Sequence, residues 1–192
     1  MAIRYKLTDE NMRTYKGFEW ELGKWYETSG EGALCSAGWF HVYTDPLLAV
    51  LLNPIHADFK APRLFETECE GVEETDHGLK CGVSRIRLVR ELAVPAVTIE
   101  QWIAFGILCA LEICGTAAWR EWAKNWLNNT NREAKAAAAA EAAAWAEAAA
   151  AWAAAAAWAA GAAVWAAGAA ARSAGAGALD LPKLARKAME IE

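Results

Sequence analysis

Four side chains in the first half of the chain have the chemistry of metal ligands: Cys35, His41, His77 and Cys81. Structural zinc sites draw their ligands in close pairs, and only His77 and Cys81 come near such a spacing. In the competing interpretation Cys35 is a small core hydrophobe and His41 is a strand histidine, and the dispersed spacing favours it. The sequence therefore predicts no bound metal, and it indicates no other cofactor.

Glu66 and Glu68 are the second candidates for chemistry, because they share one face of a predicted strand. Together with Arg13, Tyr15 and His41 they resemble the layout of an ADP-ribosyltransferase. That resemblance implies an arginine or histidine that contacts NAD, and a glutamate that stabilises an oxocarbenium-like centre. The serine–threonine–serine element of those enzymes is missing, and alternating glutamates equally suit a solvated strand face. An NAD-using enzyme is therefore the alternative hypothesis, and a chain without catalytic residues is the primary one.

The common signatures of other enzyme classes are absent from the sequence. It contains no glycine-rich phosphate loop, no GxSxG and no HExxH. Nucleotide-binding, esterase and metalloprotease chemistry of the usual kinds therefore have no support in the sequence.

Strands are the elements that must position these side chains, because apolar and polar residues alternate along them. Asp45 before Pro46 is a helix-start signal, and it predicts a short helix over 46–52 that ends at Asn53 and Pro54. The predicted strands cover residues 12–18, 39–43, 63–71 and 83–90.

From Pro95 the hydrophobic period becomes helical. Thr98 and Gln101 form a capping box that begins a helix. A second helix places three tryptophans on one face, which predicts a docking surface; these are Trp119, Trp122 and Trp126. The predicted helices cover residues 98–114, 117–127, 131–160, 162–172 and 181–190.

An alanine run from Arg132 to Arg172 dominates the second half, with 28 alanines in 41 residues. Alanine is the strongest helix former, so the run predicts helix with little help from packing. In one interpretation its tryptophans form a stiff aromatic surface that binds a partner. In the other they pack within the chain or within a homodimer, and the sequence leaves both interpretations open. These are Trp145, Trp152, Trp158 and Trp165.

The predicted fold class is α+β, with a small strand-rich head over residues 1–95 and an all-α, Ala/Trp-rich tail over 96–192. The net charge of −5 belongs to the first part of the chain, because the six basic and six acidic residues from Arg132 onward cancel. An acidic head argues against binding to a nucleic-acid backbone. The charge-free alanine stretch lacks the Leu, Ile and Phe of membrane spans, so no membrane partner is expected. Five dispersed cysteines and an N-terminus without an apolar run predict a cytoplasmic protein.

The segment LCSAGWFHVYTDPLLAVLLNPIHADF (Leu34–Phe59), followed by PRLFETECEG, resembles the DUF7666-like family of uncharacterised bacterial and phage proteins. In that family, too, stretches resembling VTIEQWIAFGILCALEI and AWREWAKNWL are followed by a tail of Ala/Trp repeats. Proteins with such a tail are labelled immunity proteins. The resemblance implies no established reaction. It implies a non-enzymatic interaction protein that acts on a host defence complex as an anti-CRISPR or immunity-type inhibitor, and that self-associates through its tail. The seven tryptophans named above are its expected partner-binding residues.

Overall fold

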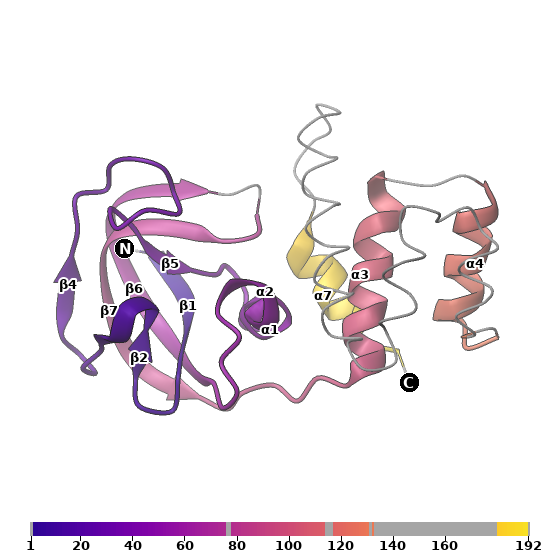
Figure 1. Ribbon diagram of the computed structural model, residues 1–192, viewed down its shortest axis with the longest axis horizontal. Coiled ribbons are helices and arrows are strands. Elements are labelled where there is room, and N and C mark those ends of the chain that lie inside the picture. Colours follow the sequence, from indigo (N-terminus) through magenta and orange to yellow (C-terminus); the bar gives the residue numbers. More distant parts are fainter. Residues whose placement is uncertain (1, 76–77, 114–116, 131, 133–179, 192) are drawn as a thin grey trace. The chain divides into compact units, whose positions relative to one another are not determined.

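The computed structural model describes residues 2–75, 78–113, 117–130, 132 and 180–191 (Figure 1). Its architecture is α+β, as the sequence predicts. The chain divides into two compact units, Met1–Ala96 with Asp180–Pro182 and Val97–Leu179 with Lys183–Glu192. The predicted helices over 131–160 and 162–172 lie outside the described residues, as do Trp145, Trp152, Trp158 and Trp165.

A curled antiparallel sheet forms the first unit. Its strands are β1 (Ala2–Thr8), β4 (Trp25–Glu27), β5 (Phe40–Val42), β6 (Arg63–Thr75) and β7 (Cys81–Leu92). The order is β1-β6-β7-β4, and β5 pairs with the first residues of β7, at 81–83. Tyr5 and Tyr43 also exchange backbone hydrogen bonds of 2.9 and 2.8 Å. The sheet therefore curls until β1 and β5 meet (Figure 1).

Two irregularities bend the long β6–β7 hairpin, one between Glu66 and Thr67 and one between Glu70 and Glu73. Gly71 lies at the second, with φ of +79°. A Cβ atom there would lie 2.3 Å from Oγ of Ser84, and this left-handed backbone conformation favours glycine. Bulges of this kind raise the local twist of a sheet, which lets the hairpin wrap around its own interior.

The predicted strand over 12–18 is wrong, because the chain reverses within it. Strand β2 (Arg13–Thr14) is followed by a 3-10 turn (η1, Tyr15–Gly17) and by β3 (Phe18–Glu19), which pairs back on β2. Lys16 takes a left-handed conformation with φ of 57°. The apolar pattern did not reveal this turn, because a non-glycine residue takes such a conformation only when its surroundings hold it there.

Helix α1 (Pro46–Leu51) begins as predicted, with the Asp45 side chain accepting a 2.8 Å hydrogen bond from the Leu47 amide. Helical structure does not end at Pro54, however. A second short helix, α2 (Asn53–His56), follows at once and contains that proline in its first turn. Proline is tolerated there because the first amides of a helix have no intrahelical acceptor.

The interior of the sheet is apolar and aromatic. Its buried side chains come from β5, β6, β7 and the segment before β4, and Met12, Tyr26 and Phe40 pack against them. The buried members are Trp20, Val42, Phe65, Cys69, Cys81, Val83, Ile86 and Leu88. The rings of Phe18, Trp20, Tyr26 and Phe40 pack in tilted or edge-to-face pairs, with centroid separations of 4.9–5.7 Å.

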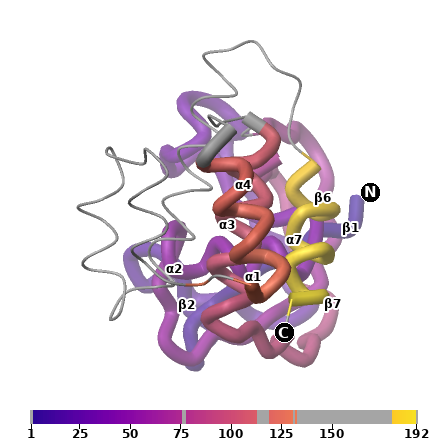
Figure 2. Tube along the Cα trace, turned by 90° about the vertical axis from the view of Figure 1, so that its right-hand side faces the viewer, coloured from indigo at the N-terminus to yellow at the C-terminus, as the bar shows by residue number. Residues whose placement is uncertain are grey.

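Helices α3 (Ile99–Ile113) and α4 (Ala117–Leu127) lie side by side in the second unit (Figure 1 and Figure 2). The predicted capping box is present: the Gln101 amide donates to Thr98 Oγ1 at 3.2 Å, and the Thr98 amide donates to Gln101 Oε1 at 3.0 Å. A last helix, α7, spans Leu181–Ala188. Each helix within the described ranges is too short or too polar to cross a bilayer.

Candidate functional site

The glutamates of β6 form a ladder of ion pairs with arginines of β7. Glu66 pairs with Arg90 at 2.8 Å, and Nε of Arg87 donates to Glu68 at 2.6 Å. Glu70 pairs in turn with Arg85. The Arg90 guanidinium lowers the pKa of Glu66 below its usual value. Side chains of Glu66 and Glu68 are each only 19% exposed, so this face is covered by arginine rather than freely solvated.

Trp25 on β4 completes this face of the sheet. The guanidinium carbon of Arg85 lies 4.1 Å from the centre of its ring, and that of Arg87 lies 4.9 Å away. Both arginines are thus held twice, by a carboxylate and by an aromatic face. Glu66 and Glu68 are paired with arginines of the same chain, Arg90 and Arg87, so in the observed geometry they stabilise the sheet.

The other residues of the hypothetical NAD site are not gathered around these carboxylates. His41 lies opposite Gly82 on β7, whereas Glu68 lies opposite Arg87. That stretch of β7 spans roughly 16 Å in an extended strand. Arg13 pairs instead with Glu19 across the small β2–β3 hairpin, at 2.8 Å.

Tyr15 occupies the turn of that hairpin and is 82% exposed. The hairpin itself is held by side chains. Asp9 accepts from the Arg13 amide at 2.7 Å, and the indole of Trp20 donates to Thr14 Oγ1 at 2.9 Å. A turn held by these hydrogen bonds therefore presents a large exposed aromatic side chain to solvent.

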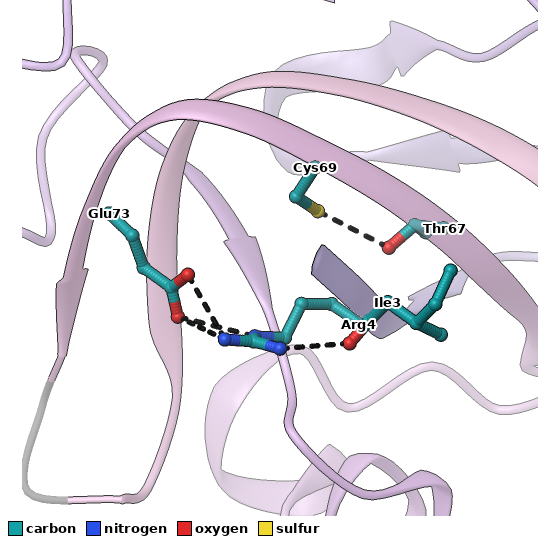
Figure 3. Close-up of polar contacts among 5 residues, drawn as sticks. All are labelled: Ile3, Arg4, Thr67, Cys69 and Glu73. Carbon is teal, nitrogen blue, oxygen red and sulfur yellow. Dashed lines mark hydrogen bonds and ion pairs between the residues drawn. The ribbon is translucent and has the colours of Figure 1, made fainter. Parts of the chain in front are cut away.

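A polar cluster lines one part of the sheet interior, and sequence reasoning missed it. The Arg4 guanidinium donates to both carboxylate oxygens of Glu73, at 2.7 and 3.0 Å (Figure 3). Sγ of the buried Cys69 lies 3.5 Å from the Thr67 hydroxyl (Figure 3). Burial, followed by the charge of Glu73, raises the pKa of the Cys81 thiol to about 11.

Lys6 is the most deeply buried cation that the described ranges contain, at 6% exposure. Its ammonium donates to the His41 carbonyl at 2.8 Å and lies 4.7 Å from the centre of the Trp20 ring. Burial lowers its pKa to about 8. The alternation of apolar and cationic residues along β1 was the available sequence signal for Lys6. It would have placed the apolar side chains toward the sheet interior, whereas the cationic ones face it.

Cys35, His41 and Cys81 do not form one ligand set. Cys81 faces the sheet interior, whereas Cys35 is exposed in the loop before β5. Across the described part of the chain, no three His, Cys, Asp or Glu side chains lie close enough together to bind a metal. His77 lies outside that part.

The tryptophans of α4 are placed unequally. Trp126 is 5% exposed, while Trp119 and Trp122 are half-buried with ring centres 6.1 Å apart. The guanidinium carbon of Arg132 lies 4.8 Å from the Trp126 ring, and its Nε donates to the Trp126 carbonyl at 3.3 Å. Trp126 is thus a packing residue, and the two upstream tryptophans form the partly open part of this face.

Comparisons with known proteins agree with the resemblance seen in the sequence. No curated protein matches the chain. No solved structure matches it either. Residues 2–100, which include every strand of the curled sheet and the first two residues of α3, match the family described as "Domain of unknown function (DUF7666)". The chain therefore belongs to the DUF7666 family.

Proposed function

We propose that this chain is a non-enzymatic protein-binding protein whose head contacts its partner through Tyr15. The observation that carries the proposal is the exposure of this tyrosine on a hairpin that is held rigid. Tyrosine is enriched among the residues that dominate binding energy at protein interfaces. A phenol that is 82% exposed contributes little to folding, so its packing role is small.

Preorganisation strengthens the argument. Ordering a loop on binding costs free energy, and a hairpin that is already ordered avoids much of that cost. Here the Arg13–Glu19 pair and the Trp20–Thr14 hydrogen bond hold both sides of the turn. Phe18, 38% exposed, and Leu22, 56% exposed, are further large apolar side chains in the same segment that reach solvent. The occupant we infer is a protein with an apolar pocket for the phenol.

The partner class is part of the same proposal. The family resemblance supports a phage or mobile-element protein that acts on a host defence complex in the cytoplasm, as an inhibitor of the anti-CRISPR or immunity type. Self-association through Trp145, Trp152, Trp158 and Trp165 stays a prediction outside the described residues. The half-buried Trp119 and Trp122 are a second partner-binding surface in this scheme.

Site-specific crosslinking tests the proposal. A photoreactive amino acid at position 15, introduced in the host cell, should link the chain to one protein, which is then purified for binding measurements. We expect Tyr15→Ala to raise the dissociation constant by about 30-fold or more, which is the effect of removing a hot-spot residue. Val72→Ala is the matched control, because Val72 is an exposed apolar residue, at 54%, on the β6–β7 hairpin.

Equal affinity of Tyr15→Ala and the unaltered protein would show that the hairpin is not the binding surface. Equal loss with Val72→Ala would show that the effect is not specific to position 15. A separate titration with NAD examines the alternative hypothesis. Hydrolysis of NAD that disappears in Glu68→Gln would replace the binding proposal by an enzymatic one.

A further inference from the structure

A cysteine and a lysine from distant parts of the chain meet at the surface of the first unit. Nζ of Lys80, just before β7, donates to Sγ of Cys35 at 3.2 Å. Cys35 is exposed, whereas the cysteines at 69, 81 and 109 are buried. The protein-binding hairpin and the Arg–Glu ladder do not use this pair.

The loop that carries Cys35 is ordered by its own hydrogen bonds. The indole of Trp39 donates to the Gly32 carbonyl at 3.1 Å, and Thr28 Oγ1 donates to the Ala37 carbonyl at 2.9 Å. These contacts close the loop on both sides of Cys35. The Cys35 sulfur therefore lies in a loop whose two ends are joined by hydrogen bonds.

The residue before the cysteine is seated directly on the sheet. A Cβ atom at Gly82 would lie 2.3 Å from Cδ1 of Leu34, so Leu34 packs against bare backbone of β7. Nε2 of His41 also lies 2.5 Å from the Leu34 carbonyl oxygen. Lys80 stands two positions before Gly82. The same stretch of chain thus seats the loop and supplies the lysine.

The Lys80 ammonium is the positive charge in contact with the Cys35 sulfur. The pKa of His56 is lowered to about 4, first by burial and then by the charges of Lys80 and His41. These three side chains therefore lie close enough to interact electrostatically. Reactive cysteines occur in partly exposed, electropositive surroundings of this kind.

From this geometry we propose that Cys35 is a peroxide-reactive thiol and that Lys80 is its proton donor. The ligand class is a hydroperoxide, which needs only access to the sulfur and a proton for its leaving group. The arrangement offers both, because Cys35 is exposed and an ammonium group lies in hydrogen-bond contact with Sγ.

The reaction is a two-electron oxidation. The Cys35 thiolate attacks one oxygen of hydrogen peroxide, so that an S–O bond forms as the O–O bond breaks. Sulfur is oxidised to a sulfenic acid, and the second oxygen departs with the bonding pair. The Lys80 ammonium donates a proton to that oxygen, so that the products are water, sulfenic acid and a neutral amine.

Trapping of the sulfenic acid in the full-length protein tests the proposal. The protein is treated with hydrogen peroxide and dimedone, and adducts are located by peptide mass spectrometry. Iodoacetamide is used in parallel, because it alkylates the same thiolate but releases iodide, which needs no proton. Circular dichroism checks that each variant is folded.

We expect the adduct at Cys35 and not at the buried Cys69, Cys81 or Cys109. Lys80→Met should slow sulfenic acid formation by about a hundredfold, the lower end of what a positioned proton donor contributes. Lys80→Arg should slow the peroxide reaction similarly, because arginine does not give up its proton. It should keep the iodoacetamide rate near that of the unaltered protein, because the positive charge remains. The matched control, Lys60→Met, should leave both rates unchanged.

Three outcomes would overturn the proposal. One is oxidation of Cys35 no faster than in the denatured protein. Another is an unchanged peroxide rate in folded Lys80→Met. The third is a peroxide rate in Lys80→Arg equal to that of the unaltered chain, which would show that charge alone, and not proton donation, is sufficient.

Discussion

At the scale of single residues, the head buries several polar side chains and gives most of them a partner. Tyr43 is an example: its hydroxyl lies 2.9 Å from Nδ1 of His56, and the two rings stack with centres 5.8 Å apart. Burial raises the pKa of Tyr43 and lowers that of His56, so both groups are neutral at pH 7. A neutral hydrogen-bonded pair avoids the large cost of burying a charge.

This arrangement predicts a loss of stability at mildly acidic pH. The folded pKa of His56, about 4, lies below its ordinary value of 6.5, so the unfolded chain binds more protons between these limits. The free energy of unfolding should therefore fall as pH drops from 6.5 to 4, by at most about 3 kcal/mol from this residue. Urea titrations across that range measure the effect.

His56→Phe is the matched variant, because it keeps an aromatic ring against Tyr43 but cannot titrate. The difference between the two proteins isolates His56 from His41 and His77, which remain in both. Parallel pH profiles for the two proteins would contradict the assignment. Glutamates whose pKa is lowered by arginine, such as Glu66 and Glu91, lose their contribution mainly as pH falls below their ordinary value of 4.5, and they do so in both proteins.

At the scale of elements, the β6–β7 hairpin is stabilised on both of its faces by different means. The interior face buries apolar side chains such as Ile86 and Leu88, which are fully buried. The exterior face holds the Glu–Arg ladder with Trp25 over two of its arginines. Most of the stability should come from the interior face, because partly exposed ion pairs contribute only about 0–1 kcal/mol each.

Substitutions in the ladder should therefore cost little. We expect Glu68→Gln to lower the free energy of unfolding by about 1 kcal/mol or less, and the loss to shrink in high salt. Arg87→Met should cost more, because it also removes the contact with the Trp25 ring. Denaturant unfolding at two salt concentrations checks both, with the exposed Glu10→Gln as control. A loss of several kcal/mol in Glu68→Gln, independent of salt, would contradict this assignment.

At the scale of the whole molecule, the chain consists of two compact units. The first has a sheet whose buried residues come almost entirely from Met1–Ala96, with Asp180–Pro182 as a short addition. A unit with its own core can fold alone.

The fragment 1–96 should accordingly unfold cooperatively and give the circular-dichroism signal of β-sheet. The reason is that all strand pairings described for the sheet lie within it. Thermal unfolding of the fragment beside the full chain measures this. A broad, non-cooperative transition would show that the sheet depends on the segment at 180–182.

Sequence patterns were sufficient where the physics is local. The capping box of Thr98 and Gln101, the N-cap Asp45, and the strands containing Glu66 and Ile86 rest on neighbouring residues, and each is present. The α+β class and the family assignment depend on the same local signals.

Tertiary structure alone decided which face of a strand is buried. β1 alternates Ile3, Tyr5 and Leu7 with Arg4 and Lys6, and a period of two cannot say which set faces inward. Here Lys6 faces the sheet interior, where the His41 carbonyl and the Trp20 ring provide partners for its ammonium. In the apolar set Leu7 is also buried, at 5%, whereas Ile3 is 46% exposed.

The contact between Cys35 and Lys80 was likewise invisible in the sequence. The two residues are 45 positions apart, and only Cys35 lies in the segment that carries the family resemblance. They meet because Leu34 packs on the bare backbone at Gly82, and that close approach exists only once the sheet has formed.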